Sequence, residues 1–412
     1  MSCFDLVCGY DDIKAELIRI HDVLRQKEKF EKLGVTKPRG LLLYGDPGLG
    51  KTRMAESFIG EWIFPVFEIS KEKPGCDVIT EIREAFAKAK EAGEQAIVFL
   101  DNLDDDADAN VYAALKVCMD AYREDDVFVL AIAKDKDNIP DYLLRPGRFD
   151  KVIEVETPTF KDAIEIINFY LALKECASDV DTEEIAGIMR GHSCADLEMV
   201  VNEAAIYACE SERQVIMQKD LLRACMCLVF ASPEKADAGK GRELLEVAVH
   251  EAGHVVAGEV LEAGCIAITY VRSHTGGSDG VTCVNYDENN GRHMKQLEHH
   301  VIRSLAGKAA TEIVLGMVDV GCADDLAGAF RRVERLVDNF CAYGFDTYED
   351  PHSSETLRAK KEQRIAEKMA EYYQAAKSLL SENRAFLDKV IEELMRKKTL
   401  RQADIKKIRA GL

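Results

Sequence analysis

One short stretch of the sequence has residue types and spacing that suit hydrolytic chemistry. Residues 250–254 read His-Glu-Ala-Gly-His, within an apolar-periodic segment from Glu243 to Ala263 that predicts a helix. Residues four apart lie on one face of a helix, so His250 and His254 can offer two imidazole nitrogens to one metal ion. Zinc suits this pair, and Glu251 can take a proton from a metal-bound water that attacks a carbonyl. The alternative is a chance match on an ordinary amphipathic helix.

A second stretch, Gly45 to Thr52, has the composition of a phosphate-binding loop. It fits the pattern GxxxxGK[ST], and it follows a short apolar run at Gly40–Tyr44 and opens a helical segment. Glycines let backbone N–H groups surround phosphates, Lys51 reaches the outer phosphate oxygens, and Thr52 offers a hydroxyl to Mg²⁺. We therefore predict a site for ATP with Mg²⁺. Its residues are Gly45, Asp46, Pro47, Gly48, Leu49, Gly50, Lys51, Thr52 and, further along the chain, Asp101.

Asp101 ends one of several short apolar runs that predict strands. These runs are Val66–Ile69, Ala96–Leu100, Val127–Ala133 and Val152–Val155, with helical stretches between the earlier ones. The alternation implies a parallel sheet with helices on its faces, and an acid after such a strand commonly holds Mg²⁺.

The residue after Asp101 departs from this pattern. Enzymes that hydrolyse ATP in this way usually carry a glutamate there to polarise the attacking water, and this chain has Asn102, which cannot act as a base. Asp104, Asp105 and Asp106 follow. A slip of register that delivered one of them would distort the strand end, so we do not expect them to replace the glutamate.

The composition limits the kinds of function that need considering. With 412 residues, 47% of them hydrophobic and 31% charged, the chain is long enough for two or three globular domains. A formal charge of −20 argues against nucleic-acid binding and against unaided docking on anionic lipid. The thirteen cysteines are scattered, and no signal peptide precedes them, so we expect reduced thiols and a cytoplasmic location. No apolar run approaches the ~18 residues of a membrane span.

Several motifs together resemble one family. Phe4–Thr52, the strand that ends at Asp101, and the run Leu-Leu-Arg-Pro-Gly-Arg-Phe-Asp at 143–150 are similar to the ATPase module of FtsH-type AAA+ zinc metalloproteases. The resemblance implies a ring, usually a hexamer, in which Arg145 and Arg148 reach the nucleotide of the neighbouring subunit. Considered without the family, they are two cations suited to stabilising phosphate charge in trans, or residues of a solvated loop.

The resemblance also implies the domain organisation. It predicts an α/β phosphate-loop AAA+ domain at 1–156, with a parallel sheet and helices on both faces, and a helical lid at 157–230. A linker at 231–241 and a mostly α-helical zinc metallopeptidase domain at 242–412 follow. In the lid, Ser193 or Asp196 is expected to cap the helix that closes over adenine.

A zinc site needs a third ligand, which the two histidines and Glu251 do not supply. The run Gly321–Leu326 resembles a glycine-led acidic motif in which the second acidic position binds zinc, and this implies Asp325. From chemistry alone Asp324 is nearly as good, and either could simply cap a helix. Gly280–Val284 resembles the strand at the cleft edge, where an extended peptide could pair by strand addition.

The rest of the C-terminal half is predicted to be helical. His299 and His300 are adjacent on a helix that continues to Ala306, so we expect them on a solvated helix face rather than in a metal site. From Ser354 to Arg396 the chain is charged and apolar-periodic and has no glycine or proline. This predicts helices packed around the zinc helix, with a coiled coil as the alternative.

Three positions depart from the family pattern. Asn102 replaces the water-activating glutamate, and Lys134 stands where a polar sensor of the γ-phosphate, usually asparagine, would lie. The loop at 70–76 lacks the aromatic-glycine motif that grips a threaded polypeptide. These departures predict slow ATP hydrolysis and weak unfolding, whereas ATP binding and ring assembly are expected to persist.

The main hypothesis is therefore a soluble, ring-forming zinc endopeptidase that degrades proteins and hydrolyses ATP slowly. The family's membrane-spanning N-terminal part is missing from this sequence, so the chain is a naturally soluble member or a trimmed one. A second hypothesis is a nucleotide-gated scaffold or adaptor, co-assembling with active, membrane-anchored relatives. A third is an ordinary ATP-driven unfolding protease in which another acid replaces the glutamate.

Overall fold

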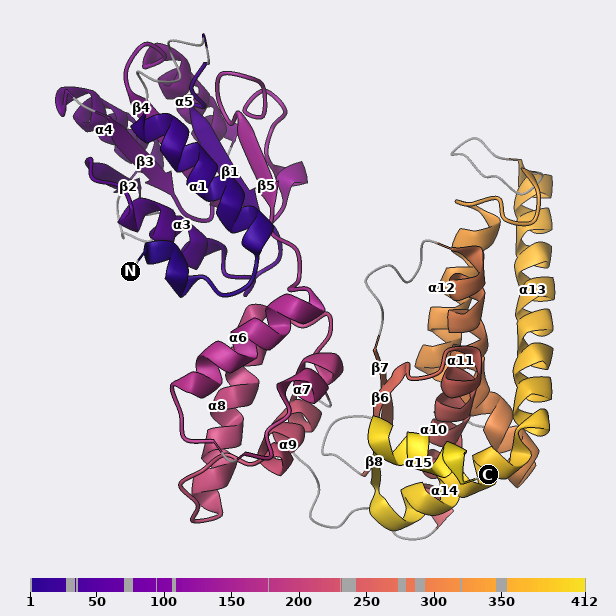
Figure 1. Ribbon diagram of the computed structural model, residues 1–412. Coiled ribbons are helices and arrows are strands. Elements are labelled where there is room, and N and C mark those ends of the chain that lie inside the picture. The colour runs from indigo at the N-terminus through magenta and orange to yellow at the C-terminus, as the bar shows by residue number, and fades with distance from the viewer. Residues whose placement is uncertain are drawn as a thin grey trace. The chain divides into compact units, whose positions relative to one another are not determined.

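The chain folds into two compact units (Figure 1). The first unit comprises Met1–Thr182 and Gly191–Asp220, and the second comprises Glu183–Arg190 and Leu221–Leu412. The computed structural model describes residues 2–26, 34, 36–69, 77–93, 95–105, 109–176, 178–229, 231, 242–272, 279–285, 293–318, 321–345 and 354–411. Within these residues, no helix has the length and apolar character needed to cross a membrane.

The first unit is built on a five-stranded parallel sheet in the order β2-β3-β4-β1-β5. The strands are β1 (Gly40–Tyr44), β2 (Val66–Ile69), β3 (Ala96–Leu100), β4 (Val127–Ala133) and β5 (Lys151–Glu154). The first four have the predicted bounds, and β5 begins and ends one residue earlier than predicted. The parallel α/β fold expected for this part of the chain is thereby confirmed.

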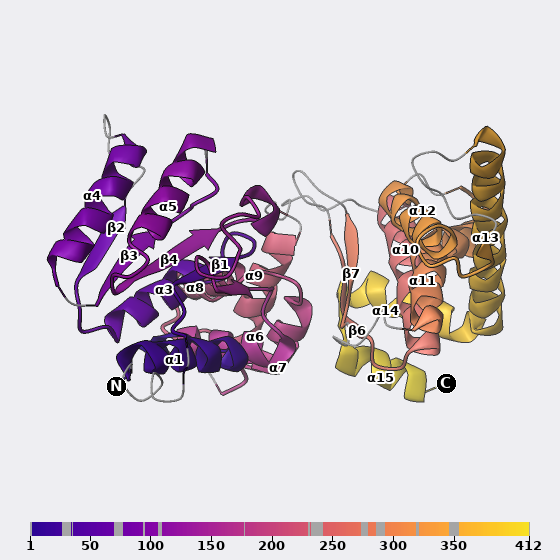
Figure 2. The same cartoon turned by 90° about the horizontal axis from the view of Figure 1, so that it is seen from above.

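Helices cover both faces of this sheet (Figure 2). On one face lie α1 (Asp11–Arg25) and α3 (Lys51–Gly60), and on the other α4 (Val78–Glu91) and α5 (Ala109–Ala121). Because successive side chains of a strand point to opposite faces, Leu42 of β1 packs in one core with Phe86 of α4 and Leu115 of α5. A short 3-10 helix, η1 (Cys3–Leu6), precedes α1. A second, η2 (Lys136–Asn138), follows β4.

Further helices follow the sheet along the chain, and they are divided between the two units. They are α6 (Phe160–Ala172), α7 (Thr182–Ile188), α8 (Cys194–Glu210) and α9 (Gln218–Val229). Ser193 is the N-cap of α8, and it forms a capping box with Asp196, in which each side chain accepts a hydrogen bond from the other residue's backbone N–H. Both residues that the sequence offered as the cap therefore take part in it.

The second unit is mostly helical, as expected, with one small antiparallel sheet. Besides most of α7 and α9, its helices are α10 (Arg242–Leu261), α11 (Met294–Leu315), α12 (Ala323–Val337), α13 (Glu355–Glu382), α14 (Arg384–Lys397) and α15 (Gln402–Ala410). Its strands, β6 (Ile266–Val271), β7 (Gly280–Val284) and β8 (Thr399–Arg401), pair in the order β7-β6-β8. The predicted strand at 280–284 is confirmed.

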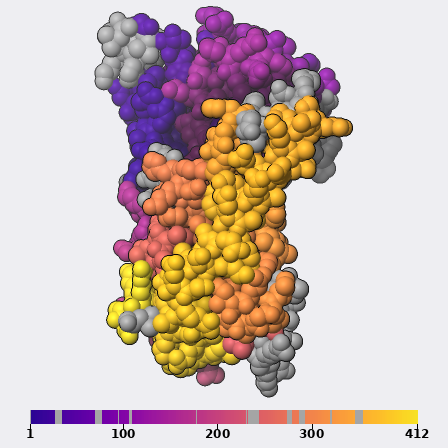
Figure 3. Space-filling model, turned by 90° about the vertical axis from the view of Figure 1, so that its right-hand side faces the viewer, coloured from indigo at the N-terminus to yellow at the C-terminus, as the bar shows by residue number. Residues whose placement is uncertain are grey.

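Helix α10 lies at the centre of this unit. Ala248, Val249 and Val255 of α10 are fully buried, in one core with Ala376 of α13 and Leu387 of α14. Figure 3 shows the outer surface of α13 and α14 on the face turned to the viewer. The prediction that the C-terminal helices pack around α10 is therefore confirmed, and α10 itself is held rigidly by neighbours on several sides.

Candidate functional site

The centre of the candidate site is the stretch of α10 that contains His250 and His254. The two rings lie one above the other, with their centroids 4.6 Å apart. Their Nε2 atoms are 2.9 Å apart, so both nitrogens point at the same space. The helical spacing therefore places both imidazoles towards one point, as the sequence predicted. A third metal ligand must come from elsewhere in the fold.

Asp325, in the first turn of α12, supplies a third donor. Its Oδ2 lies 3.1 Å from Nε2 of His250 and 3.2 Å from Nε2 of His254. Asp324 is exposed, and the ligand atoms that lie within 4.8 Å of one another belong to His250, His254 and Asp325. Burial alone would raise the pKa of Asp325, but the hydrogen bonds with both imidazoles outweigh it and hold the pKa below its usual range.

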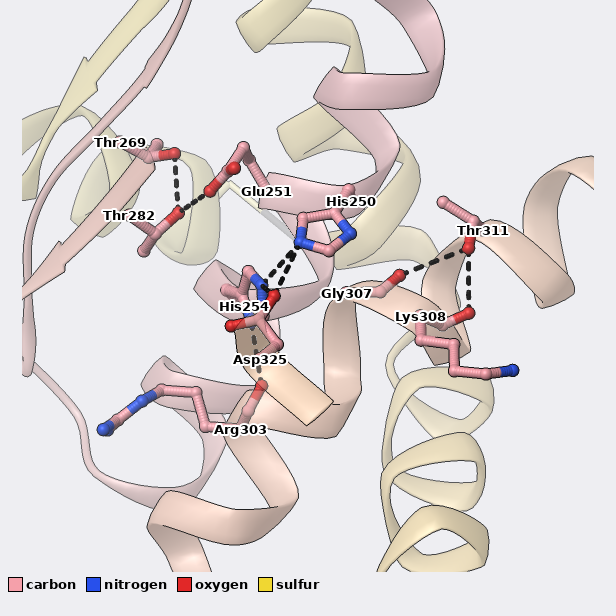
Figure 4. A network of polar contacts seen from close by, with 10 residues as sticks. All are labelled: His250, Glu251, His254, Thr269, Thr282, Arg303, Gly307, Lys308, Thr311 and Asp325. Carbon is pink, nitrogen blue, oxygen red and sulfur yellow. Dashed lines mark hydrogen bonds and ion pairs between the residues drawn. The ribbon is translucent and has the colours of Figure 1, made fainter. Parts of the chain in front are cut away.

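This set of donors fits zinc. Two imidazole nitrogens and one carboxylate oxygen, with room for a fourth ligand, form the usual composition of a catalytic zinc site. Nδ1 of His254 lies 2.8 Å from the backbone carbonyl of Arg303, and an N–H donated there leaves the Nε2 lone pair for a metal. The Arg303 carbonyl thus holds the His254 ring at Nδ1, while Nε2 faces Asp325 (Figure 4).

Glycines let α11 approach α10 closely enough to fix the other histidine. A Cβ on Gly307 would lie 2.5–2.7 Å from three ring atoms of His250, and a Cβ on Gly253 would lie 2.4 Å from the carbonyl oxygen of Ala306. Such distances are sterically forbidden, so a side chain at either position would push the two helices apart. The position of His250 therefore depends on bare backbone in both helices.

Glu251 points from α10 towards the sheet, where two threonines meet it (Figure 4). The Oγ1 of Thr282 on β7 donates to Oε2 of Glu251 at 2.6 Å, and Oγ1 of Thr269 on β6 lies 2.9 Å from Oγ1 of Thr282. Glu251 is 5% exposed. Burial raises its pKa, while the two imidazoles and the Thr282 hydroxyl oppose that rise.

These supporting residues were not found from the sequence. Thr282 lies in the strand that was predicted, but nothing in its spacing tied it to Glu251. The Arg303 carbonyl carries no side-chain signal at all. Gly307 could have been noticed as a glycine inside a strongly helical segment, where a glycine often marks close packing.

The phosphate-loop motif occupies the expected place between β1 and α3. Gly48 has φ 80° and Gly50 has φ 88°, a region that favours glycine. Lys51 is buried, and its Nζ donates to the carbonyl oxygens of Gly45 at 2.6 Å and Asp46 at 2.7 Å. Burial lowers the pKa of Lys51, and nearby carboxylates oppose that effect.

A cavity of about 520 Å³ lies over this loop within the first unit. Lys51, Thr52, Asn102 and Lys134 line it with polar groups, and apolar lining comes from the N-terminal segment, α6 and α8. The apolar lining includes Leu6, Val7, Ile166, Phe169 and Ala195. A pocket with one cationic and one apolar end has the character needed for a nucleotide.

Two aspartates beyond Asn102 hold the end of β4. Both oxygens of Asp104 accept the backbone N–H of Lys134, at 2.9 and 3.0 Å, and Oδ2 also accepts that of Asp135. Burial alone would raise the pKa of Asp104, but these backbone N–H groups outweigh it and lower the pKa. Asp105 forms an ion pair with Lys134 Nζ at 2.6 Å. Asp106 is outside the described residues.

The two arginines of the 143–150 loop differ in their surroundings. Arg145 is exposed. Arg148 is partly buried, donating from Nε and Nη2 to the carboxylate of Asp120 at 2.9 Å each, and from Nη1 to the carbonyl of Tyr142. The 70–76 loop and most of the linker, 232–241, are outside the described residues.

One expectation about histidines is wrong. His300 is 9% exposed rather than solvated, because it faces the interior of the second unit from α11, and burial lowers its pKa to about 4. The helix there also continues beyond Ala306, to Leu315. Adjacent helix residues point in different directions, and the packing of α11 turns His300 inward.

Comparison with known proteins gives three family matches and many similar chains. Residues 41–157 match the ATPase family associated with various cellular activities (AAA), residues 179–223 match the AAA+ lid domain, and residues 239–408 match peptidase family M41. An ATP-dependent zinc metalloprotease FtsH of Thermus thermophilus is 30% identical over 99% of this chain and 70% of its own length.

Two further relatives show the same pattern. An ATP-dependent zinc metalloprotease FtsH 2 of Sphaerobacter thermophilus is 34% identical over 78% of this chain and 52% of its own length. An ATP-dependent zinc metalloprotease FtsH of Halothermothrix orenii is 28% identical over 95% of this chain and 68% of its own length.

Proposed function

The chain belongs to the family of ATP-dependent zinc metalloproteases named FtsH, and from that premise we propose a ring-forming zinc endopeptidase whose ATP hydrolysis is slow. The observation that carries the proposal is the convergence of His250, His254 and Asp325 beside a buried Glu251. Protein chains are the proposed substrates.

In the proposed peptidase site, His250, His254 and Asp325 hold zinc through Nε2, Nε2 and a carboxylate oxygen. When bound, zinc lowers the pKa of a coordinated water and polarises the scissile carbonyl. Glu251 accepts the proton of the attacking water on its carboxylate and then delivers it to the leaving amine nitrogen. Its burial favours this exchange, because a raised pKa brings a carboxylate closer to the operating pH.

The substrate is proposed to lie along β7. This strand pairs with β6 on one side, and within the described sheet it has no strand on the other. An extended peptide can add to such an edge through backbone hydrogen bonds, which bind it with little regard for sequence. Because β7 also contacts Glu251 through Thr282, a peptide paired there would present its carbonyl close to the base.

In the nucleotide site, we propose that ATP with Mg²⁺ binds but is hydrolysed slowly. The phosphate loop, with Lys51, Thr52 and Asp101, retains the binding groups, whereas Asn102 cannot take a proton. Asp104 is committed to backbone N–H groups, and Asp105 is committed to Lys134. Neither of these two carboxylates is therefore available as a substitute base.

Ring assembly is part of the proposal. Exposed Arg145 is the better candidate for reaching a neighbouring subunit's phosphates, because Arg148 already pairs with Asp120 within its own chain. A homohexamer is expected. Analytical ultracentrifugation with and without ATP would test it, and Arg145→Ala would be expected to weaken any ATP-dependent assembly more than Arg148→Ala.

The experiment that tests the function is casein cleavage by zinc-loaded protein with ATP, with ADP and without nucleotide. Glu251→Gln serves as the blank. Cleavage that disappears in the blank supports the peptidase, and cleavage that persists in it contradicts the proposal. A requirement for ATP would mean that the nucleotide cycle still feeds the protease, whereas indifference to nucleotide would make the ATPase domain an assembly platform.

A second function is favoured by the altered nucleotide site alone. Asn102 and Lys134 suit a pseudo-ATPase that acts as a nucleotide-gated scaffold or adaptor and co-assembles with active, membrane-anchored relatives. Co-purification from cells would test it. A homohexamer without partners would count against the adaptor, and a mixed ring would support it.

A further inference from the structure

The contacts of Glu251 with the sheet point to a role for two threonines. The carboxylate of Glu251 on α10 accepts from Thr282 Oγ1 on β7 at 2.6 Å, and Thr282 Oγ1 lies 2.9 Å from Thr269 Oγ1 on β6 (Figure 4). Three separate elements thus meet in one row of oxygen atoms. We propose that Thr282 is a positioning residue for the catalytic base and that Thr269 in turn fixes the Thr282 hydroxyl.

The direction of each hydrogen bond in this row follows from the donors available. An ionised carboxylate can only accept, so Thr282 must donate its single hydroxyl proton to Oε2 of Glu251. Its oxygen is then free only to accept, and Thr269 must be the donor in the contact between the two hydroxyls. The row is a one-way chain that ends on the base, and the other oxygen, Oε1, is left for proton transfer.

Burial makes this arrangement stiff. Thr269 is fully buried and Glu251 is 5% exposed, whereas Thr282 between them is partly buried, so solvent has limited access to these bonds, mainly at Thr282. Hydrogen bonds to an ionised partner are stronger than those between neutral groups, and they are stronger still in a low local dielectric. The carboxylate is therefore held in one orientation before substrate arrives.

The neighbouring glycine gives this row its geometry. Gly280 and Thr282 are two apart on β7, so both face Glu251. A Cβ on Gly280 would lie 2.7 Å from Oε1 and 2.8 Å from Cγ of Glu251. The strand therefore lets Glu251 pack against bare backbone at Gly280 and anchors Oε2 at Thr282.

This row links the base to the strand on which the proposed substrate lies. The inference rests on the proposed peptidase function, because Thr282 can position a base only if Glu251 acts as one. If β7 carries the paired peptide, then Thr282 fixes the base relative to the same strand that fixes the scissile carbonyl. Strand β7 then aligns both the base and the scissile carbonyl, and such alignment contributes strongly to the rate of a catalysed reaction.

The test compares two substitutions at Thr282 that remove different atoms. Thr282→Val keeps the shape and loses the hydroxyl, whereas Thr282→Ser keeps the hydroxyl and loses the methyl group. We expect Thr282→Val to lower kcat for casein-derived peptide cleavage by about 10- to 100-fold, with KM changed less than about twofold. Thr282→Ser should recover most of that loss. A smaller fall, about three- to tenfold, is expected for Thr269→Val.

Zinc content and thermal unfolding are measured for each variant, so that a loss of metal or fold is not mistaken for a loss of positioning. The proposal is overturned if Thr282→Ser is as impaired as Thr282→Val, because the methyl group, and hence packing, would then matter most. It is also overturned if Thr282→Val retains full kcat, or if its loss follows loss of zinc.

The failure of this inference can be separated from failure of the proposed function. If Glu251→Gln cleaves as fast as the unmodified protein, the peptidase assignment itself fails. If Glu251→Gln is inactive while Thr282→Val is fully active, the peptidase stands and only the positioning role is lost.

Discussion

The zinc site and the nucleotide site of this chain meet the requirements of their chemistry to different extents. Around α10, each group that the peptidase reaction needs is present, and each is fixed by a partner, such as the Arg303 carbonyl behind His254. Around the phosphate loop, the binding groups are present, but the position of the base holds Asn102. The neighbouring carboxylates of Asp104 and Asp105 are satisfied by other bonds.

This difference indicates that, in the nucleotide site, the residues that bind ATP are not the ones that hydrolyse it. A phosphate loop needs only its backbone, Lys51 and Thr52 to hold a nucleotide, so it tolerates a changed base. In the proposed zinc centre no such division is expected, because removal of any donor or of Glu251 should abolish the reaction itself. Four experiments, in order of expected effect, would break or sharpen this comparison.

The largest effect is expected for Glu251→Gln. It removes the proton acceptor and keeps the side-chain shape, so casein cleavage should fall by about 10³-fold. Zinc content and ATP binding should be unchanged, which can be checked by elemental analysis and by titration with a fluorescent ATP analogue. Equal loss of zinc would mean that Glu251 acts in holding the metal, and the comparison between base and ligands would fail.

The second-largest effect is expected for Asp325→Asn, and it distinguishes Asp325 from its neighbour Asp324. Asp325→Asn removes a charged donor that lies within hydrogen-bond distance of both histidines, so zinc affinity should fall by at least about 100-fold. Asp324→Asn, the matched control, alters an exposed neighbour and should leave affinity within about threefold. Competition with a zinc chelator would measure both constants. Similar losses in the two variants would contradict the assignment of Asp325.

A gain of function is expected in the nucleotide site. Asn102→Glu combined with Lys134→Asn should raise ATP hydrolysis by about 10-fold or more, because it supplies a base and removes a cation that would pair with it. Asn102→Glu alone should do less, because Lys134 stays in place and can pair with the new carboxylate. The φ of residue 102 is 50°, a region that asparagine tolerates better than glutamate, and this limits the gain in both variants.

Phosphate release measured at saturating ATP would compare these variants. Lys51→Ala in the same background gives the rate that does not depend on this site. If the unmodified chain already hydrolyses ATP fast, and Lys51→Ala abolishes that rate, then another acid serves as the base and the contrast between the two sites disappears.

The smallest effect is expected from packing behind His250. Gly307→Ala would place a Cβ 2.5–2.7 Å from ring atoms of His250, so the free energy of unfolding should fall by about 1–3 kcal/mol. Gly328→Ala is the control, because its Cβ would meet only the end of the Arg332 side chain, at 3.0 Å. Denaturant titration should find that control unchanged or slightly stabilised, since alanine favours helix.

The contact between position 307 and the His250 ring also leads to a prediction for zinc affinity. Gly307→Ala should weaken zinc binding together with stability, because the displaced ring no longer points at the space shared with His254 and Asp325. If zinc binds Gly307→Ala as tightly as it binds the unmodified chain, then close approach of α11 does not set the position of His250.

Much of both sites was determined by local sequence, because local geometry decides it. The spacing of His250 and His254 places them on one helical face in any helix, and the glycines before Lys51 permit the loop conformation between a strand and a helix. Four of the five strands of the first sheet were predicted to the residue, since each is a short, largely apolar run with polar residues, glycine or proline at its ends.

Only the tertiary structure decided which distant groups meet these local motifs. Asp324 and Asp325 differ by one position on α12, and the direction from which α12 packs turns only Asp325 to the histidines. The threonines beside Glu251, the Arg303 carbonyl and the inward turn of His300 likewise follow from how sheet and helices pack. Helical and strand periods are properties of neighbouring residues, whereas the direction in which one element faces another is set by the burial of a whole domain's apolar surface.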